Sequence, residues 1–195
     1  MDFSFSGERE AVAVEKNTGY PVKMRKALEE IAVFWASFFY TGKSPKAPGT
    51  VGSLAALPLA WGAWAMGPVF GWSATLFIFI SGTLAAKVII KRTGETDHQS
   101  IVIDEVVGIL ITTSVASNLW WHYLLAFLFF RLFDITKPWP VSWVDQKWKS
   151  ALGTMMDDTL AALLAAAALW LALHAHEWSP VLHRSEEHTS ELQSR

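Results

Sequence analysis

Two adjacent carboxylates, Asp104 and Glu105, interrupt the apolar run of residues 101–117. Ionised carboxylates among Ile, Val and Leu lose much of their hydration energy, so they persist only when they are paired, protonated or bound to a cation. Asp104 and Gly108 share a helical face one turn apart, and we expect the glycine to leave room beside the carboxylate. Glu105 is turned roughly 100° around the helix and is expected to contact a different partner. The pair predicts a polar site inside an apolar fold.

The composition around this pair is typical of a membrane protein. Hydrophobic residues make up 52% of the 195 residues and charged residues only 17%, which is too apolar for an ordinary soluble domain of this size. A full membrane span needs about 20 apolar residues. Five apolar segments are expected to be helices: residues 54–66, 70–90, 101–117, 119–135 and 159–173. Those shorter than a full span are expected to tilt, to have charged ends in the interface, or to be buried in the bundle. The predicted fold class is all-α, a small helical integral-membrane bundle with short spans.

Three regions are distinguished along the chain. Residues 1–20 form a polar N-terminal segment, and residues 21–178 form one membrane domain. The domain begins with an amphipathic helix over residues 21–40, which is expected either to lie on a membrane surface or to pack against the core. Residues 184–195 are unrelated in composition to the rest and resemble a translated adapter sequence, so we exclude them from the fold. The absence of cysteine excludes disulfides and thiolate chemistry, and a net charge of −2 gives no support to nucleic-acid binding.

Lysine and arginine are distributed asymmetrically among the connections. If all five segments cross the membrane, the connections at residues 67–71 and 118–121, which contain no Lys or Arg, lie on one side, and the basic connections lie on the other. Because short basic connections stay in the cytoplasm, the N-terminus is predicted to be cytoplasmic. The ionisable clusters of the chain then all reach the cytoplasmic end, which predicts one active site there.

A loop rich in Gly, Pro and hydroxyl groups, residues 41–53, precedes the second predicted helix. Pro45 and Pro48 are expected to end the helix before it, and Thr50 or Ser53 to cap the helix after it. A glycine-rich turn at a helix N-terminus presents free N–H groups to an anion, and Lys43 adds positive charge. The loop therefore predicts a phosphate site, although a surface turn that starts a helix explains the same residues, because the loop is not a Walker pattern.

Further acids and bases accompany the central pair. Asp157 and Asp158 are expected to open the last helix, where acids also suit the helix dipole. Arg131 and Asp134 are neighbours at i,i+3, which an intrahelical salt bridge would also explain. His98 is a candidate ligand or proton donor, or else a solvated loop residue. Several acids beside a basic, glycine-rich loop are typical of a site for Mg²⁺ and a phosphate ester.

Four motifs in order carry a specific resemblance. They are Lys43-Ser-Pro-x-Ala-Pro-Gly-Thr-Val-Gly-Ser-Leu54, Asp97-His-x-Ser-Ile-Val-Ile-Asp-Glu-x-x-Gly108, Phe130-Arg-x-x-Asp-x-x-Lys-Pro-Trp-Pro140 and Gly153-x-Met-x-Asp-Asp158. Over about residues 30–175 the chain resembles the phosphatidylglycerophosphatase A family. The resemblance implies a multi-pass enzyme of the bacterial inner membrane with its active site facing the cytoplasm. Such an enzyme uses Mg²⁺ to hydrolyse the terminal phosphate of phosphatidylglycerophosphate, a membrane lipid, to phosphatidylglycerol. The chain departs from the family pattern after Asp158, where Thr-Leu-Ala-Ala stands and a glycine is expected.

The hypothesis assigns three sets of residues. The catalytic candidates are Asp104, Glu105, Asp134, Asp158 and His98. The candidates for binding the phosphate are Lys43, Ser44, Gly49, Thr50, Gly52, Ser53, Arg131 and Lys137. The candidate Mg²⁺ ligands are Asp104, Glu105, Asp134, Asp157 and Asp158. The sequence leaves open whether water or an aspartate attacks the phosphorus, how many Mg²⁺ ions bind, and the oligomeric state.

One alternative from another class is a small ion-coupled transporter, because intramembrane carboxylates and interrupted helices also mark transporters. A transporter would place its acids near the middle of the spans, whereas these acids are predicted to gather at one end.

Overall fold

The computed structural model describes residues 21–95 and 98–193, which form helices and connecting turns without a strand. The all-α prediction is confirmed for this part of the chain. The predicted segment 1–20 and the motif residue Asp97 lie outside it. The elements, in order, are α2 (Val22–Ala36), the 3-10 helix η1 (Thr41–Lys43), α3 (Pro48–Ala65), α4 (Pro68–Thr93), α5 (Ile103–Thr112), the 3-10 helix η2 (Thr113–Val115), α6 (Trp120–Thr136), α7 (Val141–Lys147) and α8 (Ala151–Gln193).

The short helix α5 forms the centre of the bundle. It packs against α3, α4, α6 and α8, and nine of its ten residues are buried. Ten residues of α-helix extend about 15 Å, half of the roughly 30 Å hydrocarbon thickness of a bilayer. For residues 101–117 we predicted tilting, charged ends in the interface, or burial in the bundle. The structure shows burial in the bundle.

Within residues 21–95 and 98–193, two helices are long and apolar enough to cross a membrane. They are α4 and the first part of α8, Ala151–Ala175. The outer face of α4 is apolar, since Phe77 is 64% exposed and Leu84 61% exposed. An exposed apolar face of this kind is suited to contact with lipid.

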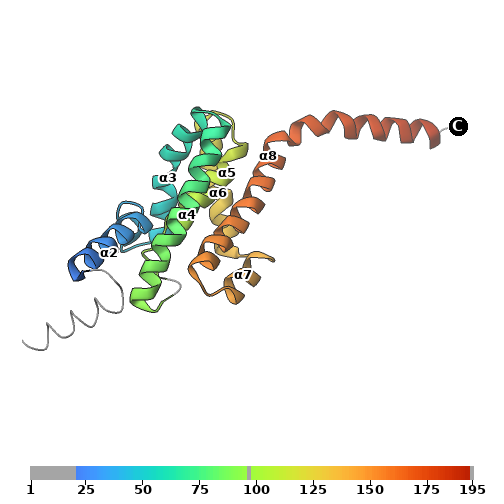
Figure 1. The fold of residues 1–195 in the computed structure, drawn as a ribbon. Helices are drawn as coiled ribbons and strands as arrows, with labels where there is room; N and C mark the ends of the chain where they lie inside the picture. The colour runs from blue at the N-terminus through green and yellow to red at the C-terminus, as the bar shows by residue number, and fades with distance from the viewer. Residues whose placement is uncertain (1–20, 96–97, 194–195) are drawn as a thin grey trace, which may run out of the picture.

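The direction of the helices brings their polar ends together. α3 and α5 begin, α6 ends and α8 begins at the same end of the bundle, next to α7 (Figure 1). This arrangement gathers the four sequence motifs at one end of the fold.

Several predicted helix boundaries were wrong. α8 begins at Ala151, so Asp157 and Asp158 lie in its second turn rather than at its start. The first helix ends at Ala36, well before Pro45. α3 begins at Pro48 after Ala47, whose φ is 47°, and no side chain caps it, so neither Thr50 nor Ser53 has the predicted capping role. Proline at the first helical position supplies a helix start without a capping side chain, because its missing N–H needs no partner there.

Small residues allow close packing beneath the site. A Cβ atom at Gly108 would overlap the ring of Phe130, so the space that we predicted beside Asp104 is filled by an aromatic side chain of α6. On α8, Ala161 and Ala162 are fully buried. The alanines that stand where we expected a glycine therefore still permit close contact between α8 and the bundle.

Candidate active site

A pocket of about 510 Å³ lies at the end of the bundle where α3, α5, α6 and α8 meet. Its charged and titratable lining residues come from the loop before α5, from α5, α6 and α8, and from the residue that follows α6: His98, Asp104, Glu105, Arg131, Asp134, Lys137, Asp157 and Asp158. Gly49, at the start of α3, also lines it. The structure thus brings together residues that lie more than 100 positions apart in the sequence.

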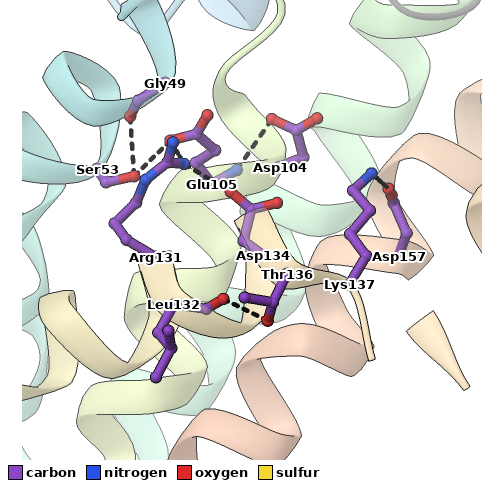
Figure 2. A network of polar contacts seen from close by, with 10 residues as sticks. All are labelled: Gly49, Ser53, Asp104, Glu105, Arg131, Leu132, Asp134, Thr136, Lys137 and Asp157. Atoms are coloured by element: carbon purple, nitrogen blue, oxygen red, sulfur yellow. Dashed lines mark hydrogen bonds and ion pairs between the residues drawn. The ribbon is translucent and has the colours of Figure 1, made fainter. Parts of the chain in front are cut away.

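Glu105 is held by the first turns of α3. The hydroxyl group of Ser53 donates a hydrogen bond to the Glu105 carboxylate (Figure 2). A Cβ atom at Gly49 would overlap the same carboxylate, so only glycine allows the backbone of α3 to approach so closely. Gly49 and Ser53 therefore seat Glu105 in the structure.

Arg131 is clamped by two carboxylates. Its Nη1 atom lies 3.0 Å from Glu105 Oε2 and 2.6 Å from Asp134 Oδ2. The predicted proximity of Arg131 and Asp134 is confirmed, and the contact with Glu105 makes the arginine a link between α6 and α5 as well. Its Nε atom is buried and has no hydrogen-bond partner within the described part of the chain.

Lys137 links α6 to the two elements that follow. Its Nζ atom donates to Asp145 Oδ1 at 2.8 Å and to Asp157 Oδ2 at 2.7 Å. Burial alone would lower the pKa of Lys137, but the hydrogen bonds to the two carboxylates and their charges raise this pKa above its usual value. The hydrogen bond from Lys137 lowers the pKa of Asp145. Sequence analysis missed Asp145, because nothing in a spacing of eight residues across a helix break predicts a contact.

Asp104, Asp157 and Asp158 are 5–6% exposed. Asp158 is close enough to Asp104, Asp134 and Asp157 to be repelled by them. Oδ1 of Asp104 accepts the backbone N–H of Glu105 at 2.9 Å. Oδ1 of Asp157 is buried, and no hydrogen-bond partner for it is found among the described residues.

The charges in and around the pocket do not balance. Six carboxyl groups, those of Asp104, Glu105, Asp134, Asp145, Asp157 and Asp158, accompany two cationic side chains, those of Arg131 and Lys137. Such a surplus in a buried site needs protons or a cation. Over residues 21–95 and 98–193, no group of three or more His, Asp or Glu side chains is already arranged to hold a metal ion.

His98 lines the pocket from the loop before α5. Its Nδ1 atom lies 2.7 Å from Ser100 Oγ and accepts the backbone N–H of Ser100 at 3.3 Å. When Nδ1 is an acceptor, the ring proton is on Nε2. The loop contact thus fixes the ring and leaves Nε2 as the donor.

Five of the predicted phosphate ligands do not line the pocket. Lys43, Ser44, Thr50, Gly52 and Ser53 are not among its lining residues. The Lys43 amine lies 4.3 Å above the ring of Tyr40. Gly52 packs closely against Val102. Of the loop that was predicted to bind phosphate, Pro45, Ala47, Pro48 and Gly49 reach the pocket.

Comparisons with known proteins agree on one family. The sequence pattern of the phosphatidylglycerophosphatase A family matches residues 34–173. The chain is 34% identical to phosphatidylglycerophosphatase A of Escherichia coli over 145 residues, which cover 72% of this chain and 81% of that protein. It is 36% identical to phosphatidylglycerophosphatase A of Haemophilus influenzae over 152 residues, which cover 77% and 93%.

A third relative has a different name. The chain is 35% identical to a putative phosphatidylinositol-3-phosphatase of Bacteroides thetaiotaomicron over 150 residues, which cover 68% of this chain and 90% of that protein. No solved structure matches the chain. The family match spans the pocket and the helices that form it, and we conclude that this chain belongs to the phosphatidylglycerophosphatase A family.

Proposed function

We propose that this protein hydrolyses the terminal phosphate monoester of phosphatidylglycerophosphate with the help of Mg²⁺ and yields phosphatidylglycerol for phospholipid biosynthesis. Family membership and the names of two relatives support this activity. The observation that carries the proposal is a pair of buried atoms without partners among the described residues. Arg131 Nε is a donor suited to an anion, and Asp157 Oδ1 is an acceptor suited to a cation.

Arg131 and Lys137 are the residues that we assign to the phosphate oxygens. Both line the pocket, and charge-assisted hydrogen bonds to phosphate are the strong kind. Glu105 and Asp134 hold the guanidinium group in place, so we assign them to orienting Arg131. Gly49 and Ser53 are assigned an indirect role, because they hold Glu105 in position.

The donor set fits Mg²⁺. Carboxylate oxygens are its preferred protein ligands, and it commonly takes one or two of them together with waters and substrate phosphates, so a complete protein cage is not required. We assign Asp104, Asp158 and Oδ1 of Asp157 to the cation. When bound, Mg²⁺ would add positive charge beside the phosphate and acidify a water molecule.

Proton transfer is assigned to His98 and to two of the buried acids that we also place at the cation. His98 holds its Nδ1 atom against Ser100, and we assign its Nε2 atom as a donor toward an oxygen of the phosphate group. Asp104 and Asp158 are buried in the same pocket. A carboxylate in such surroundings is suited to accept a proton from water during hydrolysis.

We place the enzyme in the bacterial inner membrane as a multi-pass protein with its pocket facing the cytoplasm. The length and apolar character of α4 and of the first part of α8 support membrane insertion. The basic residues near the pocket end support a cytoplasmic orientation. The comparisons give no support to the alternative of an ion-coupled transporter.

Phosphate release by the purified full chain in detergent tests the substrate. With Mg²⁺ present, the protein should release phosphate from phosphatidylglycerophosphate much faster than from phosphatidylinositol 3-phosphate, the substrate named for the third relative. The reverse preference, or no release from either lipid, would contradict the proposed function.

A further inference from the structure

The Lys137 amine lies between two carboxylates with different surroundings. Asp157 of α8 is 8% exposed in its side chain, whereas Asp145 of α7 is 33% exposed. Asp157 lines the pocket and Asp145 does not. Asp145 can therefore act on a ligand in the pocket only through its neighbours, which are Lys137 and, by charge repulsion, Asp157.

Sharing the amine has a consequence for Asp157. A lysine ammonium group has three N–H donors, and Asp145 and Asp157 take one each. Oδ1 of Asp157 remains buried without a partner in the described part of the chain. Without Asp145, Coulomb attraction would draw the amine toward both oxygens of Asp157.

We propose that Asp145 is a positioning residue of the phosphatase site, which holds the Lys137 amine away from Asp157 Oδ1. The third N–H of Lys137 and this oxygen then both remain for a phosphate group and its cation. The identity of the lipid rests on the proposed function, but the effect on phosphate binding does not. The competing explanation is that Asp145 only docks α7 onto the bundle, which would affect folding and leave the affinity of the folded protein unchanged.

Binding of inorganic phosphate separates the two explanations. The dissociation constant is measured by calorimetry on the full chain in detergent with Mg²⁺, beside the midpoint of thermal unfolding. Asp145→Asn should raise the dissociation constant roughly tenfold, the size expected when a charge-assisted hydrogen bond is misplaced. Asp145→Glu keeps the charge and should stay within about threefold of wild type. Gln146→Ala, an exposed neighbour on α7, is the control and should bind phosphate as wild type does.

Phosphate binding needs no turnover, so a wild-type protein that fails to hydrolyse phosphatidylglycerophosphate would refute the proposed function separately. An unchanged dissociation constant in Asp145→Asn overturns the positioning role, whether or not the unfolding midpoint falls.

A double-mutant cycle gives a second, independent test. If Asp145 acts through Lys137, adding Asp145→Asn to Lys137→Met should leave the phosphate dissociation constant of the single Lys137→Met variant unchanged. A further rise of roughly tenfold in the double variant would show separate action and overturn the proposal. The double variant also keeps the proposal testable if Asp145→Asn alone folds poorly, because removal of both partners leaves no unpaired lysine charge.

Discussion

Arg131 Nη1 lies 3.0 Å from Glu105 Oε2 and thereby joins α6 to the buried helix α5. The same nitrogen lies 2.6 Å from Asp134 Oδ2, so two carboxylates fix the guanidinium group at the pocket wall. A group that is already fixed loses little conformational entropy when it binds a ligand. The arginine is therefore oriented before a phosphate group arrives.

Replacement of Arg131 by lysine tests this orientation. Arg131→Lys keeps the charge but loses the planar fork that reaches two carboxylates and a phosphate group at once. We expect KM for phosphatidylglycerophosphate to rise roughly tenfold or more, with the protein still folded. Arg92→Lys, at the exposed end of α4, is the matched control. Steady-state kinetics decide the point, and an unchanged KM in Arg131→Lys would remove the arginine from the phosphate site.

Gly49 and Gly62, both on α3, form a matched pair for a packing test. A Cβ atom at Gly49 would overlap the Glu105 carboxylate, whereas one at Gly62 would meet nothing within 4 Å. Gly49→Ala should lower the free energy of unfolding by about 1–3 kcal/mol, the usual range for overpacking, and should also lower activity by displacing Glu105. Gly62→Ala should stabilise the protein by up to about 1 kcal/mol, because alanine favours a helix interior. Equal effects of the two substitutions on thermal unfolding and activity would contradict the close approach of α3 to Glu105.

Asp104→Asn removes a buried carboxylate with little change of shape. Loss of a group that binds the cation or transfers a proton should lower kcat by at least about a hundredfold. The variant should remain folded in detergent, because asparagine still accepts the Glu105 N–H. Glu30→Gln, which changes an exposed carboxylate on α2, should leave kcat unchanged. Phosphate release at saturating lipid measures both, and wild-type turnover by Asp104→Asn would exclude this acid from the reaction.

The ion pair of Lys137 and Asp145 predicts a pH dependence of stability. The pKa of Asp145 is lowered in the folded state by its hydrogen bond from Lys137, so its contribution is present above the unfolded pKa of about 3.9 and is lost as the pH falls through the folded value. Asp145→Asn should lower the free energy of unfolding by less than about 1 kcal/mol at pH 7, since the pair is partly exposed to solvent. The difference between variant and wild type should shrink below about pH 4. Thermal unfolding of both proteins at pH 7 and pH 3 measures it, and a difference that grows in acid would contradict the ion pair.

The sequence predicted the location of the site better than its details. Apolar segments that alternate in direction must return their ends to the same side, so the meeting of Asp104, Arg131 and Asp158 followed from the order of the segments. The i,i+3 contact of Arg131 and Asp134 followed from helix geometry.

Other features depended on tertiary packing. Helical spacing places Gly108 beside Asp104, but only the fold shows that the Phe130 ring fills that space. The start of α8 was missed because its first turn is Ala151-Leu-Gly-Thr154, which has no acidic residue and contains a glycine, a poor helix former. Asp145 was missed because its partner lies on the other side of a helix break, where no periodicity applies.

Divalent-cation dependence of turnover, compared between wild type and Asp104→Asn, tests the central claim most directly. The claim is that the surplus of carboxylates gathered at one end of the bundle serves a cation-assisted phosphatase. Phosphate release from phosphatidylglycerophosphate is measured after treatment with EDTA and again after Mg²⁺ is restored. We predict that EDTA abolishes release by the wild type, that Mg²⁺ restores it, and that Asp104→Asn stays inactive at every Mg²⁺ concentration. Full wild-type activity in EDTA would contradict the account.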